Sequence, residues 1–266
     1  MRVLALQYHD VVGPEGPDAS GFPGPAAATY KLDATNFAAH LRAVSAVAPA
    51  TRRVLAPALV TPAARAAGVT PVLFTFDDGG VAAYERTAAL LETRGWRGHF
   101  LVTTDYVGAP GFCSAAQLRA LHARGHVVGA HSCSHPTRMS RCDDATLRRE
   151  WGGSVARLAD LLGAPVTVAS VPGGYFSRRV AKVAAACGVR VLFTSEPSAN
   201  AYQVDRCLVV GRYTLRRGSP PSVAAALAAG RLAPRAAQWT VWNAKKLFKN
   251  VAGDAYLRTR AALLRG

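Results

Sequence analysis

Seven short apolar segments, separated for the most part by helical ones, constrain the fold of this chain more than any other feature. The apolar segments are 2–8, 72–76, 99–103, 127–130, 166–171, 189–194 and 207–213. Amphipathic helical patterns occupy 81–94, 115–124, 143–162 and 178–187, and a glycine suited to a C-terminal cap follows each of them, at Gly95, Gly125, Gly163 and Gly188. Apolar strands that alternate with such helices predict a parallel sheet covered by helices on its outer face, as a barrel or an open sheet.

Composition excludes several classes of protein. Half of the 266 residues are hydrophobic, so the chain can bury a substantial core without disulfides. The five cysteines are an odd number and include no Cys-x-x-Cys pair, which argues against a disulfide framework and a zinc site built from cysteine. The formal net charge of +16 permits anionic partners, yet no recognition motif accompanies it, and we expect no nucleic-acid binding.

Two regions depart from the regular alternation. Residues 10–67 are expected to form an insertion after the first strand, with a Gly/Pro-rich loop at 10–29 that could flank a site, and then helical segments. Residues 1–233 are expected to form a single domain. The first apolar run is too short for a signal peptide, and no stretch is long enough to span a membrane, so a cytoplasmic location is expected.

Residues 234–266 are expected to form a basic C-terminal helical extension. Apolar residues recur there at three- and four-residue steps, and the lysines lie off that stripe. The stripe consists of Val241, Ala244, Phe248, Val251 and Ala255, and the lysines are Lys245, Lys246 and Lys249. Such a helix either packs against the domain or lies on an anionic membrane surface, which would place the protein at the inner membrane face.

Polar residues follow most of the predicted strands. In parallel α/β folds the C-terminal ends of the strands open onto the loops, so these residues are expected to converge on one site. Asp77 and Asp78 follow an apolar strand and cannot both face the core; they indicate either an Asp-Asp-Gly turn or a metal ligand beside a base. His131 and His135, four residues apart after another strand, could bind one divalent ion together with a carboxylate.

At this point the motifs resemble those of a known family. Thr75-Phe76-Asp77-Asp78-Gly79 and His131-Ser132-Cys133-Ser134-His135 are similar to the first two motifs of the NodB-homology polysaccharide deacetylases, carbohydrate esterase family 4. They occur in the family's order, and the resemblance covers about 70–215. It implies a distorted (β/α)7 barrel, with Asp77 as general base and Asp78, His131 and His135 as ligands of zinc or of another divalent ion such as cobalt, nickel or iron.

Two further motifs of the family are altered in this chain. The third is usually Arg-x-Pro-Tyr-Gly, but here Ser170 takes the place of the arginine that orients the base. The arginines that could replace it are Arg178, Arg179 and Arg212. The following residues still resemble the motif, so that Gly173 would supply the oxyanion donor and Tyr175 would lie beside the substrate.

The last motif of the family, which supplies the general acid, is missing because no histidine follows His135. Tyr8-His9-Asp10 instead resembles a variant that carries the catalytic histidine on the first strand, and this makes His9 the candidate acid. His40, His99, His122 and His126 are expected to be structural.

The resemblance implies a metal-dependent hydrolase that removes N-acetyl groups from an amino sugar, in a polysaccharide or in an intermediate of exopolysaccharide biosynthesis. Its partner would be an N-acetylated glycan. An O-acetyl esterase would use the same residues. The alternative from another class is a catalytically impaired module that binds carbohydrate or metal, which the Ser170 replacement and the missing C-terminal histidine would favour.

Overall fold

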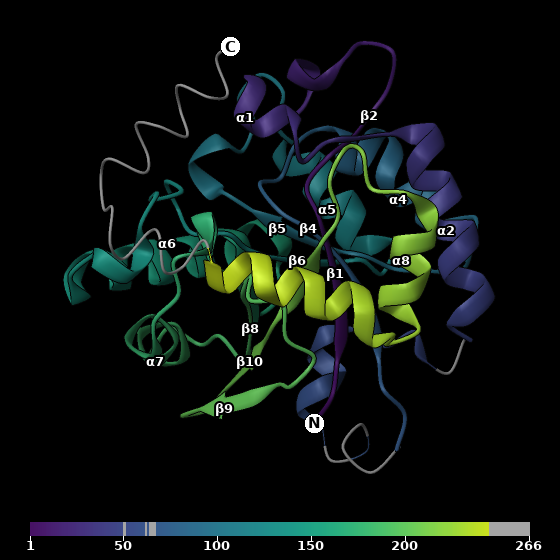
Figure 1. Ribbon diagram of the computed structural model, residues 1–266. Coiled ribbons are helices and arrows are strands. Elements are labelled where there is room, and N and C mark those ends of the chain that lie inside the picture. Colours follow the sequence, from purple (N-terminus) through teal and green to yellow (C-terminus); the bar gives the residue numbers. More distant parts are fainter. Residues whose placement is uncertain (50–51, 62, 64–67, 245–266) are drawn as a thin grey trace.

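A parallel barrel with helices on its outside forms the body of the protein (Figure 1). The computed structural model describes residues 1–49, 52–61, 63 and 68–244. Its barrel strands are β1 (Leu4–Tyr8), β4 (Val72–Phe76), β5 (His99–Val102), β6 (Val127–Ala130), β7 (Val168–Ser170), β8 (Val191–Phe193), β10 (Cys207–Val210) and β11 (Arg212–Thr214). Neighbouring strands in the series β1-β4-β5-β6-β7-β8 pair in parallel.

One continuous strand segment closes this series into a ring. β10 pairs in parallel with β8, while β11, which begins after one intervening residue, pairs in parallel with β1. Gly211 separates the two halves, and there the chain changes from one neighbour to the other. The predicted distorted seven-stranded (β/α) barrel is therefore confirmed. Each of the seven apolar segments forms one position around the barrel, and β10 and β11 together form the seventh.

Each of the four predicted helical segments contains a helix, with small differences at the ends and within the first segment. The outer helices are α2 (Ala34–Val47), α4 (Ala88–Glu92), α5 (Ala115–Ala123), α6 (Asp144–Leu162), α7 (Arg178–Ala186) and α8 (Pro221–Ala228). The segment predicted at 81–94 consists of a π-helical turn, Ala83–Thr87, followed by α4. All four predicted cap glycines have positive φ, between 65° and 97°, as expected where a helix ends in a left-handed residue.

Smaller elements escaped the sequence analysis. β9 (Tyr202–Val204) pairs antiparallel with β10 at the edge of the sheet. The insertion contains β2 (Val11–Val12), the short helix α1 (Pro25–Ala28) and β3 (Leu32–Asp33), and its helix α2 buries Phe37, Leu41 and Val44.

Alternation along the strands separates the apolar core from the site. Successive side chains of a strand point to opposite faces, so every second residue points into the barrel. The inner apolar cluster comprises Val3, Ala5, Ala56, Leu59, Leu73, Leu101, Val168, Val191, Phe193, Leu208 and Val210. One step further along the same faces come polar residues: Gln7 after Ala5, Thr75 after Leu73, and Ser170 after Val168. The C-terminal half of the barrel interior is therefore polar.

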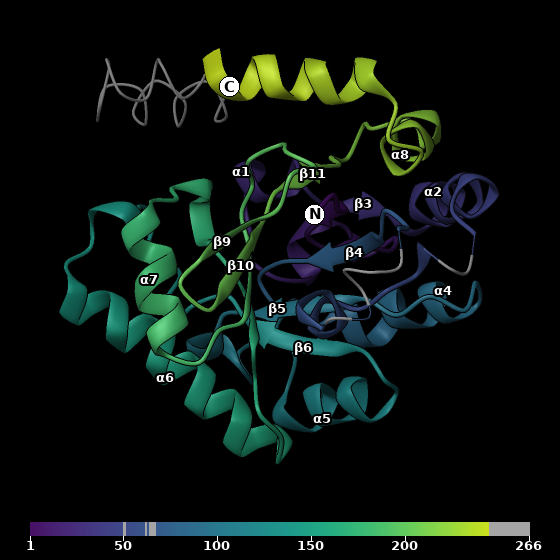
Figure 2. The ribbon, with the colours of Figure 1, turned by 90° about the horizontal axis from the view of Figure 1, so that it is seen from below.

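A helix over 232–244 follows α8 and lies along one side of the barrel, with β11 beneath it in Figure 2. It contacts the barrel through Arg235, Gln238 and Trp242, at helical spacing i, i+3 and i+7. The described part of the predicted stripe does not pack against the barrel, since Val241 is 52% exposed.

The predicted contact of this helix with an anionic membrane concerns Lys245, Lys246 and Lys249, which lie outside the described residues. Within the described ranges no helix combines the length and apolar character needed to cross a membrane. The division of the chain at residue 233 stays a prediction.

Gly211 lies where the chain changes strand neighbour, and a side chain does not fit there. A Cβ there would lie 2.5 Å from the carbonyl oxygen of Glu196 and 2.6 Å from that of Ser198. We expect Gly211→Ala to lower the free energy of unfolding by about 1–3 kcal/mol, because the backbone must move to admit the methyl group. Urea unfolding measures this loss. Gly218→Ala is the control, since nothing lies within 4 Å of its Cβ, and equal stabilities of the two variants would contradict this account.

Candidate active site

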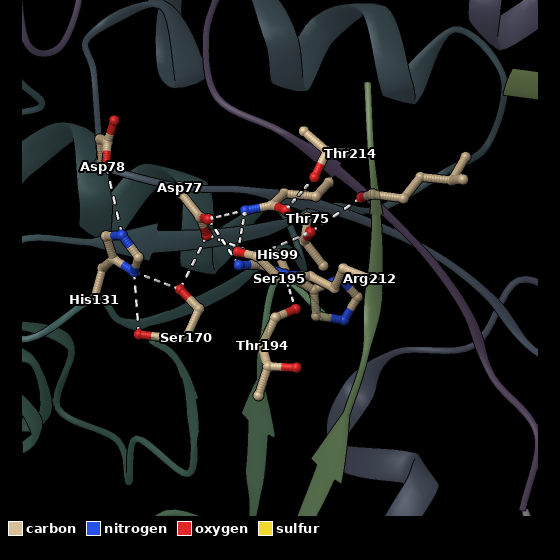
Figure 3. A network of polar contacts seen from close by, with 12 residues as sticks. Thr75, Asp77, Asp78, His99, His131, Ser170, Thr194, Ser195, Arg212 and Thr214 are labelled. Atoms are coloured by element: carbon tan, nitrogen blue, oxygen red, sulfur yellow. Dashed lines mark hydrogen bonds and ion pairs between the residues drawn. The ribbon is translucent and has the colours of Figure 1, made fainter. Parts of the chain in front are cut away.

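Asp77 lies at the mouth of the barrel, directly after β4, and is almost completely buried (Figure 3). Its Oδ1 accepts hydrogen bonds from Arg212 Nη1 at 2.7 Å and Ser170 Oγ at 2.9 Å. Its Oδ2 accepts from Arg212 Nη2 and from Gln7 Nε2, both at 2.8 Å. A carboxylate offers about four lone-pair sites, so all the acceptor capacity of Asp77 is used in this network.

Arg212 supplies the guanidinium that the third motif lacks. Its side chain is fully buried and forms a two-pronged ion pair with Asp77. Two of the three remaining N–H groups bind the Thr194 carbonyl oxygen at 3.1 Å and Thr75 Oγ1 at 3.2 Å. Of the three arginines that the sequence left open, the structure therefore brings Arg212 to Asp77. Arg179 instead pairs with Asp144 at the surface.

This pairing sets the charge of Asp77. Burial alone would raise the pKa of the carboxyl group, but the guanidinium of Arg212, helped by His131, lowers it well below its ordinary range. Asp77 is therefore expected to be a carboxylate at neutral pH.

Asp78, His131 and His135 come together beside Asp77. Oδ1 of Asp78 lies 3.5 Å from Nε2 of His131 and 3.6 Å from Nε2 of His135. One ligand atom from each residue falls within a group no wider than 4.8 Å. Ligand atoms bound tetrahedrally at about 2.0–2.1 Å from zinc would lie about 3.3 Å apart, so the spacing matches a metal site.

The hydrogen bonds of these residues also fit a metal. Oδ1 of Asp78 is buried and accepts no hydrogen bond from any residue that the structure describes. Nδ1 of His131 lies 2.6 Å from Ser170 Oγ and 3.1 Å from the Ser170 carbonyl oxygen, so that a proton on Nδ1 leaves Nε2 as a ligand. Burial lowers the pKa of His131 to about 3, which keeps the ring neutral, and burial raises that of Asp78 to about 7 in the absence of a cation.

Both loops that carry the candidate ligands contain strained residues. Asp78, in the loop after β4, has φ 77°, and Ser132 and His135, in the loop after β6, have φ 67° and 60°, which is uncommon for residues other than glycine. Ser132 Oγ accepts a hydrogen bond from the His135 backbone N–H at 3.1 Å. Glu150 of α6 accepts from the backbone N–H groups of residues 133 and 134, at 2.9 Å each. These contacts stabilise the orientation of both imidazoles.

His9 follows β1 and lies near the carboxylates. Tyr8 pairs with Phe76 across β1 and β4, so His9 and Asp77 are the next residues of two adjacent parallel strands. The ring also packs against Tyr30, with centroids 4.7 Å apart. Nδ1 of His9 is buried and has no hydrogen-bond partner in the described part of the chain. This position suits the acid that the resemblance implies, and the role itself stays a prediction.

Gly173, Gly174 and Tyr175 form the loop after β7. Gly173 has φ 65°, and a Cβ there would lie 2.6 Å from the carbonyl oxygen of Thr137, so only glycine fits. The Tyr175 ring lies under the guanidinium of Arg138, which is 5.9 Å from the ring centroid. The loop is thus placed at the barrel mouth, and the oxyanion role of Gly173 and the substrate role of Tyr175 stay predictions.

The loop at 10–29 flanks the site, as the sequence suggested. Buried Lys31 holds it, because Nζ donates to the carbonyl oxygens of Pro17, Ser20 and Phe22 at 2.5–2.7 Å. The Phe22 ring in turn packs against His135, with centroids 5.1 Å apart. One wall of the metal site is therefore aromatic.

Sequence reasoning missed Gln7 and Glu150. Gln7 lies in an apolar strand, and only its alternation with Ala5 and the candidate His9 could have indicated that it points into the site. Glu150 is a buried charge in a helix that otherwise appears amphipathic, and no local signal marks it. The histidines expected to be structural behave so where they are buried: His40, His99 and His126 all bind main-chain atoms.

Metal retention tests the three-residue site. After incubation with zinc, we expect His131→Ala and His135→Ala to hold much less metal than the wild type, because each removes one of three candidate protein ligands. His122→Ala, at an exposed position near the end of α5, is the control and should keep its zinc. Elemental analysis measures occupancy, and full occupancy in both His131→Ala and His135→Ala would refute the assignment.

The Asp77–Arg212 pair predicts a pH-dependent loss of stability in Arg212→Met. The folded-state pKa of Asp77 lies below the unfolded value of about 3.9, so the pair stabilises the wild type above about pH 4 and less as pH falls. We expect the variant to lose about 3–5 kcal/mol in free energy of unfolding at pH 7, because a buried carboxylate is left unpaired.

This deficit should shrink below about pH 5, where the variant can protonate Asp77. Urea unfolding at several pH values measures it, and Arg217→Met, at an exposed position, is the control. A deficit that does not change with pH would show that Arg212 acts by packing alone.

Comparisons with known proteins agree with this geometry. Residues 64–192 match the family model described as polysaccharide deacetylase, a segment that contains both aspartates, both candidate histidine ligands and Ser170. His9 and Arg212 lie on either side of it. No curated protein matches the chain.

Solved structures share the fold. IcaB from Ammonifex degensii is 23% identical, with a TM-score of 0.69 over 86% of this chain and 97% of that chain. Streptococcus pyogenes deacetylase PplD, in complex with acetate, is 17% identical, with a TM-score of 0.63 over 83% and 95%. A Bacillus cereus polysaccharide deacetylase is 17% identical, with a TM-score of 0.67 over 85% and 69%.

The segment that matches the family model and the barrel that brings its motifs together lead to one assignment: residues 64–192 belong to the polysaccharide deacetylase family, and the protein is a deacetylase.

Proposed function

We propose that this protein hydrolyses the N-acetyl group of an amino sugar in a glycan chain or in an intermediate of exopolysaccharide assembly. The observation that carries the proposal is that a buried carboxylate, Asp77, paired with Arg212, lies beside the three-residue cluster Asp78, His131 and His135. The acetate bound by the Streptococcus pyogenes deacetylase is the product that such a reaction would release.

Asp78, His131 and His135 would hold the divalent cation. Two imidazoles and one carboxylate suit zinc, and they also suit iron, cobalt or nickel. A cation at this place would polarise the attacking water and the acetyl carbonyl.

The protein's own groups would then move the protons. Asp77 takes the proton of the attacking water, for which one of its neutral donors, Gln7 or Ser170, must release an acceptor site. The Gly173 N–H stabilises the negative oxygen that develops from the carbonyl. His9 donates a proton to the departing nitrogen, because an amide anion is a very poor leaving group.

Two alternatives follow from the same residues. An O-acetyl ester would fit the same groups, and its alkoxide leaves more readily than an amine. The impaired-module alternative is not favoured, because Arg212 supplies the guanidinium whose loss at position 170 suggested it. The cytoplasmic location and the attachment to an inner membrane face stay predictions.

Asp77→Asn separates chemistry from metal binding. The amide cannot accept a proton, so we expect acetate release to fall by about 10²–10⁴-fold while zinc stays bound. Acetate release from N-acetylglucosamine oligomers and elemental analysis measure the two effects. Asp105→Asn, at an exposed carboxylate, is the control. Activity within a few-fold of the wild type would mean that another group is the base.

His9→Ala tests the acid. We expect the variant to keep its zinc and to lose at least about 10²-fold in amide hydrolysis, with a smaller loss on an activated acetyl ester, whose leaving group needs less protonation. His122→Ala should match the wild type on both substrates. Equal losses on amide and ester, or no loss on either, would remove His9 from this role.

A further inference from the structure

The Gly/Pro-rich loop beside the metal site is held by a buried lysine. Nζ of Lys31 donates to the carbonyl oxygens of Pro17, Ser20 and Phe22, and the side chain is 2% exposed. A lysine ammonium has three N–H groups, and here each of them binds a main-chain oxygen, which can only accept. Lys31 is therefore bound as a cation, and it fixes the path of the loop between Pro17 and Phe22.

The segment that this lysine holds contacts the loops that follow three of the barrel strands. Ser20 Oγ accepts a hydrogen bond from the Ala82 backbone N–H at 2.9 Å, in the connection after β4. The Gly21 N–H donates to the Gly111 carbonyl oxygen at 2.8 Å, in the connection between β5 and α5. The next residue, Phe22, packs against the loop after β6, so the segment bridges the loops on one side of the metal site.

The two candidate histidine ligands differ in how their rings are held. Nδ1 of His131 has a hydrogen-bond partner in Ser170. The ring of His135 forms no hydrogen bond with another residue of the described ranges, and its side chain is 27% exposed. A metal-bound histidine is usually oriented by a hydrogen bond to its second ring nitrogen. In the case of His135, the ring of Phe22 packs against the imidazole instead, with centroids 5.1 Å apart.

We propose that Lys31 is a positioning residue for the metal site, which acts by holding Phe22 against His135 and so keeps this imidazole turned toward Asp78 and His131. A side chain that must be ordered when a ligand binds weakens the binding, whereas one that is already held in place does not. Loss of Lys31 would release the loop and weaken metal binding, although all three ligands remain. This inference rests on the metal site of the proposed function.

The test measures the zinc dissociation constant of the wild type, Lys31→Met, Phe22→Ala and the double variant, by competition with a chelating dye. We expect each single change to weaken zinc binding at least about 10-fold, as is typical when a residue that orients a metal ligand is removed. The double variant should bind zinc no more weakly than the weaker single variant, because both changes remove the same contact. A lysine that only stabilised the fold would not show this coupling.

Two control variants separate metal binding from stability. Lys182→Met changes an exposed lysine of α7, and Leu118→Ala removes a buried side chain of α5 on another side of the barrel. Neither should change the zinc dissociation constant, although Leu118→Ala should unfold at a lower urea concentration than the wild type.

Unchanged zinc binding in folded Lys31→Met would overturn the inference, and so would effects of the two changes that simply add. If Lys31→Met does not fold, Phe22→Ala decides, because the lysine is proposed to act through this ring: weaker zinc binding would support the inference, and unchanged binding would overturn it. A wild type that binds zinc but releases no acetate would refute the proposed function and leave this test intact. A wild type that binds no zinc would contradict the inference.

Discussion

A buried ion pair between Arg212 and Asp77 is the interaction on which the rest of the site depends. Removing a guanidinium and a carboxylate from water is costly, and the cost is offset only when every donor and acceptor finds a partner. Here the last strand brings Arg212 into the barrel, where it binds Asp77, Thr75 and the Thr194 carbonyl oxygen. The chain segment that closes the barrel at Gly211 also carries Arg212, which lowers the pKa of Asp77. The stability of the fold and the charge of the proposed base therefore depend on the same segment.

The same pairing constrains the proposed base. With Arg212, Gln7 and Ser170 all donating to it, Asp77 is a well-ordered carboxylate but has no lone pair to spare at rest. The two neutral donors are the ones that can turn away at low cost, whereas the guanidinium is held by its other contacts. Ser170 also contacts His131, so its hydroxyl connects the carboxylate to the candidate metal site. At position 170 a serine hydroxyl, which joins Asp77 to His131, thus takes the place of the positively charged arginine of the motif. The positive charge beside Asp77 is supplied by Arg212 of β11 instead.

Sequence reasoning predicted those parts of the protein that depend on local patterns. Apolar runs predicted the seven strands, and polar residues after them predicted that Asp77, Asp78, His131 and His135 would meet, because parallel strands end at one rim. Arg212 could not be singled out, because its place depends on a strand that pairs with two different neighbours. The apolar stripe through Val241 did not predict which face of the helix over 232–244 contacts the barrel. That face is formed by Trp242 and two polar residues, Arg235 and Gln238, whose contacts are with residues distant in the sequence.

The ionisation of Asp77 tests the central claim most directly. Carboxyl-carbon NMR of the metal-free protein, labelled at aspartate and assigned with Asp77→Asn, would follow this group alone. The account predicts that its signal keeps the carboxylate shift from pH 8 down to about pH 4, and that in Arg212→Met the same signal titrates at higher pH. A wild-type signal that titrates with a midpoint above about pH 4 would contradict the account, because Arg212 would then not hold Asp77 as a carboxylate.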